Sequence, residues 1–170
     1  MSHRRPIIGE GTTTVVASPD EVLSFVLDLE QYKKADHKIG RVGTIDRRGD
    51  TGTVEFSGRI LGLPGPRGVY PYRRSGNRLE FTSPISGPAR WFLEFRGTFE
   101  CTEVDNGTHV THREEYRFKL PWTLLVAPLL RGWFERDTPR EMARFQELLG
   151  KPQEATRTNQ AEPNSRSKAP

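Results

Sequence analysis

The chain has 170 residues, a mass of 19.4 kDa and one cysteine, so we expect a single domain without a disulfide bond and a cytoplasmic location. Its formal net charge is +4, and this excess lies at the two ends of the chain, which leaves residues 6–150 with equal numbers of acidic and basic side chains. This balance argues against a basic face for nucleic acid, and no apolar run is long enough for a signal peptide or a transmembrane helix. We therefore expect no specific nucleic-acid partner and no transmembrane segment.

Apolar residues are unevenly distributed, and their distribution predicts three segments. Residues 151–170 contain only three apolar residues, all of them alanine, among many Pro, Gln, Asn, Ser and Thr residues. Such a segment has almost nothing to bury, so we expect a disordered tail. We expect a flexible N-terminus over residues 1–8 and one folded, ligand-binding domain over residues 9–150.

The first predicted elements are a strand and two short helices. Residues 10–17 are rich in Thr and Val, which favours a strand. Ser18 and Glu21 have the spacing of a capping box, and apolar residues then recur at helical spacing through residues 22–29. A second short helical turn is expected over residues 29–34.

From Ile39 onward the hydrophobic pattern changes to alternation, which predicts about six further strands. Because only one face of each strand is apolar and the turns are short, the strands should pair in an antiparallel sheet with one solvated face. Residues 90–102 alternate most clearly, and Asn106-Gly107 is typical of a hairpin turn. The Gly- and Pro-rich segments 62–68 and 86–88 are predicted to be loops, either at the entrance of an interior space or as plain connections.

A long helix over Trp122–Leu149 is predicted to cover the apolar face of the sheet. Pro128 would kink this helix or mark an early boundary. Thr138–Glu141 repeats the capping-box pattern, so the helix either restarts or bends there. Gly150 should end it.

This order of elements resembles the helix-grip fold of the SRPBCC superfamily, which includes START lipid-transfer domains and polyketide cyclase/dehydrase-type proteins. The residues that carry the resemblance are VVASPDEVLSFVLDLEQY (15–32) and RDTPREMARFQELL (136–149). It extends over residues 10–149 and departs at residues 33–36, Lys-Lys-Ala-Asp, where many members have Pro and Trp. The resemblance implies an α+β helix-grip fold: a curved antiparallel sheet of about seven strands wrapped around the long C-terminal helix, with two short helices after the first strand.

One predicted strand, Val110–Phe118, places three polar side chains on its apolar face. Strict alternation groups His112, Glu114 and Tyr116 with the apolar residues that face inward. A buried carboxylate is costly unless it is paired, so the three side chains suggest a cavity that contains water or a ligand. A buried network with an inward arginine, or a bulge that turns them outward, would explain the same pattern. They are candidates for acid–base catalysis, although we assign no catalytic residue.

Aromatic and aliphatic residues of the inner face complete the predicted ligand site. The predicted lining is Phe56, Ile60, Phe81, Trp91, Phe95, Phe99, His112, Glu114, Tyr116 and Trp133. Core packing explains each apolar member equally well. The other histidines and Cys101 lack the spacing of metal ligands and no phosphate-binding loop is present, so no metal and no cofactor are expected.

The predicted cavity and the resemblance lead to three functional hypotheses. The leading one is a carrier that binds a small apolar or amphipathic ligand, lipid or polyketide-like, between the sheet and the C-terminal helix. The second is a polyketide aromatase/cyclase or dehydratase-type enzyme that uses the same cavity. The third is a protein-interaction module with a vestigial cavity, whose partner the sequence does not identify.

Overall fold

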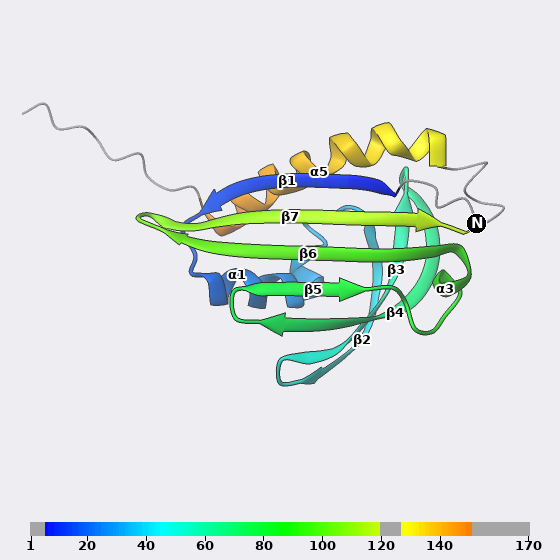
Figure 1. Ribbon diagram of the computed structural model, residues 1–170, viewed down its shortest axis with the longest axis horizontal. Helices are drawn as coiled ribbons and strands as arrows, with labels where there is room; N and C mark the ends of the chain where they lie inside the picture. The colour runs from blue at the N-terminus through cyan, green and yellow to red at the C-terminus, as the bar shows by residue number, and fades with distance from the viewer. Residues whose placement is uncertain (1–5, 120–126, 151–170) are drawn as a thin grey trace, which may run out of the picture.

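Seven antiparallel strands form one sheet in the computed structural model, which describes residues 6–119 and 127–150 (Figure 1). The strand order is β1-β7-β6-β5-β4-β3-β2. In chain order the elements are β1 (Ile7–Val15), α1 (Pro19–Leu27), α2 (Leu29–Tyr32), β2 (Ile39–Arg48), β3 (Thr51–Ile60), β4 (Leu63–Ser75), β5 (Arg78–Thr82), α3 (Ala89–Phe92), β6 (Leu93–Val104), β7 (Gly107–Phe118) and α5 (Ala127–Leu149). The predicted α+β helix-grip fold is confirmed.

Helix α1 begins at the predicted capping box. The Glu21 backbone N–H donates to the Ser18 hydroxyl, and the Glu21 carboxylate accepts the Ser18 backbone N–H at 2.8 Å. The apolar face of α1 is buried, with Val22 and Val26 fully inaccessible. The helix therefore closes one side of the core, where it contacts β6.

Bulges curve the sheet into a concave surface. The register of β2 against β3 shifts on both sides of Val42, and that of β3 against β4 shifts between Ser57 and Arg59. Each bulge bends its strand and increases the local twist. In Figure 1, β3 accordingly runs across the direction of β6 and β7.

Two glycines of β1 let helix α5 approach the sheet closely. A Cβ at Gly9 would overlap the hydroxyl oxygen of Thr138, and one at Gly11 would lie 3.0 Å from the Thr138 carbonyl oxygen. Figure 1 shows α5 running alongside β1. The helix is continuous through Pro139, so it does not restart at Thr138. The first part of the predicted helix, residues 122–126, lies outside the described residues.

Two predicted boundaries are corrected by the structure. Strand β1 begins at Ile7, which is buried, so the folded part starts before residue 9. The predicted loop over residues 62–68 is wrong, because Leu61 and Gly62 alone form the turn and β4 begins directly after them. Both turn residues have positive φ angles, which suits a two-residue hairpin.

Proline and glycine are tolerated at the start of β4 for a structural reason. β5 pairs only with Tyr72–Ser75 of β4, so residues 63–68 pair with β3 alone and have an open edge. A strand edge without a partner needs no N–H from Pro64 or Pro66. The predicted β6–β7 hairpin is confirmed, but its two turn residues are Asp105 and Asn106, one position earlier than predicted, because Gly107 already pairs with Val104. No helix of the described residues is long and apolar enough to cross a bilayer.

Candidate functional site

A cavity of about 90 Å³ lies on the concave side of the sheet, between two clusters of core residues. Its lining residues are Leu29, Tyr32, Asp36, Lys38, Ile39, Phe56, Gly58, Arg59, Ile60, Pro66, Tyr70, Phe81, Leu93, Phe95, Phe99, His112, Glu114, Tyr116, Phe118 and Phe134. Arg59 is exposed, so the cavity reaches the surface beside β3. Most of this lining is apolar, which agrees with the predicted interior space.

Eight of the ten predicted lining residues lie on this cavity. They are Phe56, Ile60, Phe81, Phe95, Phe99, His112, Glu114 and Tyr116. All eight come from strands whose alternation identified the inner face. The two predicted tryptophans lie elsewhere.

The prediction that Trp91 lines the ligand site is wrong. It lies in α3 rather than in a strand, its side chain is 70% exposed, and the Arg90 guanidinium lies 5.1 Å from its ring centroid. Strand β6 begins two residues later, and Leu93 lines the cavity instead. Over four residues a single helical turn cannot be distinguished from alternation, so the alternating pattern does not show where β6 begins.

Trp133 is half-buried and lies outside the cavity lining. Its ring packs against Phe134 with centroids 4.8 Å apart, in the smaller of the two core clusters. Phe134 is the aromatic residue of α5 that reaches the cavity, where its ring stacks on Tyr116. The prediction therefore chose the right part of α5, but the residue that contacts the cavity is Phe134, one position after Trp133.

The three polar side chains of β7 point inward, as alternation predicted. His112 and Glu114 are almost completely buried, and the imidazole ring stacks on Phe99 with centroids 3.9 Å apart. The Tyr116 hydroxyl donates to Oε1 of Glu114 at 2.9 Å. The regular pairing of β6 with β7 excludes a bulge that would turn these groups outward.

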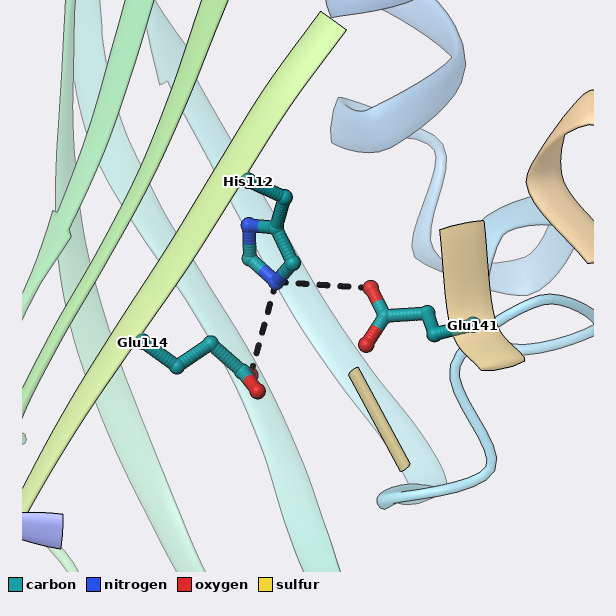
Figure 2. Close-up of side chains that lie close together, drawn as sticks. All are labelled: His112, Glu114 and Glu141. Atoms are coloured by element: carbon teal, nitrogen blue, oxygen red, sulfur yellow. Dashed lines mark ion pairs between the residues drawn. The ribbon is translucent and has the colours of Figure 1, made fainter. Parts of the chain in front are cut away.

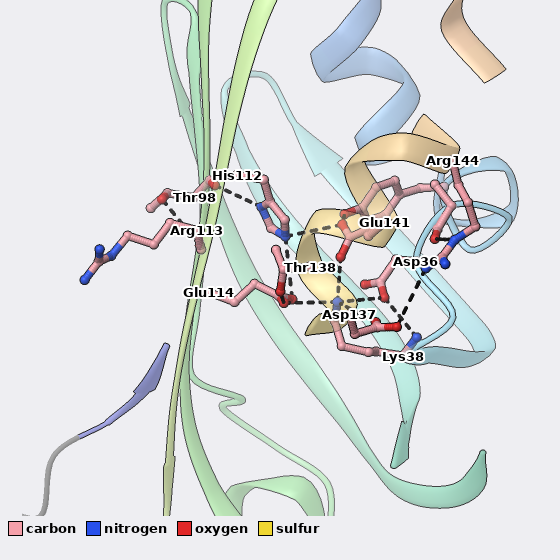
Figure 3. Close-up of polar contacts among 12 residues, drawn as sticks. Asp36, Lys38, Thr98, His112, Arg113, Glu114, Asp137, Thr138, Glu141 and Arg144 are labelled. Atoms are coloured by element: carbon pink, nitrogen blue, oxygen red, sulfur yellow. Dashed lines mark hydrogen bonds and ion pairs between the residues drawn. The ribbon is translucent and has the colours of Figure 1, made fainter. Parts of the chain in front are cut away.

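A lysine supplies the positive charge in this buried cluster (Figure 3). The Lys38 ammonium lies 3.0 Å from Oε2 of Glu114, 2.5 Å from Oε2 of Glu141 and 3.1 Å from Oδ1 of Asp36. Asp137 lies further out, 3.5 Å from the same nitrogen. The sequence left open the alternative of a buried polar network around an inward arginine. Such a network exists, and its cationic side chain is Lys38.

The sequence did not identify Asp36, Lys38 or Glu141 as site residues. Glu141 had one usable signal, because it follows Phe134 by seven residues and precedes Phe145 by four, which places a carboxylate inside an apolar helical face. The capping-box interpretation of Thr138–Glu141 hid that signal. Asp36 and Lys38 follow α2 in a segment without periodicity, so no pattern showed their direction.

Burial and mutual charge shift the titration of this cluster. Burial and the negative charge of Glu141 raise the pKa of Asp36. Burial alone would lower the pKa of Lys38, but the surrounding carboxylates hold it well above its usual value. Burial would likewise raise the pKa of Glu114, but the Lys38 charge lowers it below the usual range. Lys38 and Glu114 are therefore charged at neutral pH.

Two groups of donor atoms among the described residues are close enough together to share a metal ion. One is Asp36, Asp137 and Glu141, and the Lys38 ammonium already lies among these carboxylates. The other is His112, Glu114 and Glu141, shown in Figure 2. The site thus offers hydrogen-bond donors and acceptors, exchangeable protons and one donor set for a cation.

The sequence matches a known family over almost its whole folded part. Residues 7–150 match the family model described as polyketide cyclase / dehydrase and lipid transport. No curated protein matches the chain.

Solved structures with the same fold include one named as an aromatase/cyclase and one named as a lipid transfer domain. A Thermus thermophilus protein, TTHA0849, is 17% identical with a TM-score of 0.68, covering 84% of this chain and 96% of its own. The Zhui aromatase/cyclase from Streptomyces sp. R1128 is 12% identical with a TM-score of 0.67, covering 84% and 92%. The lipid transfer and protein localization domain of human StarD13 is 13% identical with a TM-score of 0.61, covering 84% and 77%. At these identities the likeness establishes the fold alone.

Proposed function

Because this chain belongs to the polyketide cyclase/dehydrase and lipid transport family, we propose that its cavity binds a small apolar or amphipathic molecule. The observation that carries the proposal is the contrast between the cavity walls. Most of the lining is aromatic or aliphatic, whereas His112, Glu114 and Tyr116 form one polar wall. Small-ligand sites commonly combine an apolar surface with a few convergent polar groups. The polar group of the ligand therefore lies at this wall, which we call the polar wall.

The volume of the cavity limits the size of a ligand that can enter without movement of the wall residues. A volume of about 90 Å³ holds several water molecules but is smaller than the roughly 150 Å³ apolar cavity that accommodates benzene. A ligand with a ring or an acyl chain must therefore displace wall residues. The exposed mouth beside Arg59, next to the two-residue turn at Leu61-Gly62, is the side from which a longer ligand would extend outward.

Filling the cavity should abolish ligand binding without unfolding the protein. Gly58 lines the cavity, and a Cβ there would meet no atom within 4 Å, so Gly58→Leu should place a side chain in the space meant for the ligand. We expect at least a tenfold loss of affinity for the fluorescent amphiphile 8-anilinonaphthalene-1-sulfonate. Ligands that co-purify with the wild type, detected by native mass spectrometry, should also disappear.

Gly132→Leu is the matched control for this substitution. A Cβ at Gly132 also meets no atom within 4 Å, but the residue lies on α5 outside the cavity lining. Its affinity for the dye should stay within twofold of the wild type. Equal binding by Gly58→Leu and wild type would show that the cavity is not the binding site.

A second candidate function, catalysis on a polyketide-like substrate, is favoured by the chemistry of the polar wall. A phenol, an imidazole and a carboxylate that touch one cavity can donate and accept protons on a bound carbonyl compound. Holding a flexible poly-carbonyl chain in one folded conformation would supply much of the acceleration. The aromatase/cyclase among the structural neighbours makes this the enzyme activity to test.

Tyr116→Phe separates the carrier from the enzyme. In a carrier the variant should weaken binding of a polar ligand by about 1–3 kcal/mol, because the ligand group loses a buried partner. In an enzyme it should reduce turnover of a poly-β-ketone substrate by at least a hundredfold while binding changes little. Tyr72→Phe is the control, because Tyr72 is a buried tyrosine of the same sheet that does not line the cavity. Unchanged binding and the absence of turnover in both proteins would contradict any role of the polar wall.

A further inference from the structure

We propose that His112, Glu114 and Glu141 bind a divalent metal ion, with Zn²⁺ as the best fit, at the polar wall (Figure 2). The inference goes beyond ligand binding in the cavity and does not depend on it. The three donor atoms are buried and lie within 4.8 Å of one another. No sequence pattern indicated this site, because Glu141 joins the other two residues only when α5 packs over the sheet.

The first argument is the state of the His112 ring. Nδ1 lies 3.0 Å from the carbonyl oxygen of Thr98, which can only accept, so Nδ1 carries a hydrogen. The other ring nitrogen, Nε2, is buried and has no hydrogen-bond partner. Figure 2 shows it directed at the carboxylates of Glu114 and Glu141. A ring nitrogen between two carboxylates needs a positive charge there, which is either a proton on a ring whose pKa the two glutamates raise or a bound cation. Metal-binding histidines commonly donate their second N–H to a backbone carbonyl in this way.

The second argument is the spacing of the donor atoms. Nε2 of His112 lies 3.3 Å from Oε1 of Glu141 and 3.6 Å from Oε1 of Glu114. Charge-assisted hydrogen bonds are shorter, about 2.7–2.9 Å, and the single Nε2 hydrogen of a protonated ring would bond only one of the two carboxylates. Zinc bonds of about 2.1 Å in a tetrahedron place neighbouring ligand atoms about 3.4 Å apart. The observed separations fall on either side of that value.

The third argument is the charge of the whole cluster. Four carboxylates, those of Asp36, Glu114, Asp137 and Glu141, face Lys38 within 3.5 Å. Arg144 adds a second positive charge on the outer side, 3.9 Å from Asp137. Acidic side chains therefore outnumber basic ones by four to two in this buried site, and an added cation would lower the repulsion among the carboxylates.

Hydrogen bonds already orient the two carboxylates as ligands. Lys38 binds Oε2 of both glutamates, which leaves Oε1 of each for the ion. Tyr116 and Tyr32 donate to these Oε1 atoms of Glu114 and Glu141. Three protein ligands leave a fourth tetrahedral position, as in catalytic zinc sites. Because His112 and Glu114 line the cavity, that position would face a ligand in it.

Zinc titration of the full-length, untagged protein tests the proposal. After treatment with a chelator and its removal, wild-type protein should bind one Zn²⁺ per chain with a Kd in the micromolar range or below, measured by calorimetry. His112→Gln and Glu141→Gln should each weaken binding at least tenfold. His109→Gln is the control, because His109 lies on the same strand with its ring bonded to Thr14, and its affinity should equal that of the wild type.

A spectroscopic measurement on the wild type keeps the test independent of variant stability. Co²⁺ added to the wild type should give the intense visible absorption of a four-coordinate site with nitrogen and oxygen ligands, and Zn²⁺ should displace it. Failure of the wild type to bind Zn²⁺ at one per chain would overturn the proposal. Equal loss of affinity in His109→Gln and His112→Gln would do the same, because it would place the ion elsewhere.

Discussion

Replacing Lys38 by methionine should lower the free energy of unfolding by about 3–5 kcal/mol, the usual cost of removing one partner from a buried ion pair. The lysine side chain is only 6% exposed and its ammonium contacts Asp36, Glu114 and Glu141. Without it these buried carboxylates would repel one another with no positive charge between them. Urea unfolding followed by fluorescence would measure the change, in a buffer with a chelator so that no metal ion replaces the lost charge.

Two further variants test the electrostatic explanation. Lys34→Met removes an exposed lysine four residues earlier and should change stability by no more than about 0.5 kcal/mol. Adding Glu141→Met to Lys38→Met should restore part of the lost stability, because one of the unpaired carboxylates is then absent. A Lys38→Met protein as stable as the wild type, or a double variant less stable than either single one, would contradict the network as the source of the effect.

Local pattern was sufficient to predict the sheet and its inner face. In β7, alternation over Val110–Phe118 assigned every side chain to the correct face. The strand is paired on both sides, so its register cannot slip by one residue and move the side chains to the other face. The predictions failed where local pattern and tertiary pairing differ. At residues 62–68 proline and glycine suggested a loop, but an open strand edge tolerates them. At Trp91 one helical turn has too few residues to show its period.

The polar cluster could be predicted only in part, because its members come from three separate segments. The alternation along β7 showed that the side chains of His112 and Glu114 point inward, but alternation does not show which residues of other segments they contact. Asp36 and Lys38 precede β2, and Glu141 lies on α5, so their contact depends on how closely α5 approaches the sheet. The close approach depends on the absence of side chains at Gly9 and Gly11 of β1. The sequence pattern of each segment, taken separately, does not show that these glycines affect the polar cluster.

Helix α5 also supplies the largest expected packing effect, at Phe145. This side chain is fully buried, and its ring makes edge-to-face contacts with Phe25 and Tyr32 at centroid distances of 5.4 and 6.2 Å. Phe145→Ala should therefore cost about 3–5 kcal/mol of stability, through lost burial and the cavity that remains. Trp133 makes the comparison informative, because it is an aromatic residue of the same helix and was predicted to line the ligand site. Since Trp133 is only partly buried, Trp133→Ala should cost less stability than Phe145→Ala.

The two alanine variants should also differ from the cavity variants in their ligand binding. Neither Phe145 nor Trp133 lines the cavity, so the dye affinity of the folded variants should remain close to that of the wild type. Thermal unfolding and dye titration on the same samples would separate stability from binding. If Trp133→Ala lost dye affinity while its stability hardly changed, Trp133 would be a lid over the cavity and not a part of the smaller core cluster. If both variants cost the same stability, α5 would bury more of Trp133 in solution than its partly exposed side chain indicates, and the helix would pack more tightly against the sheet at that end.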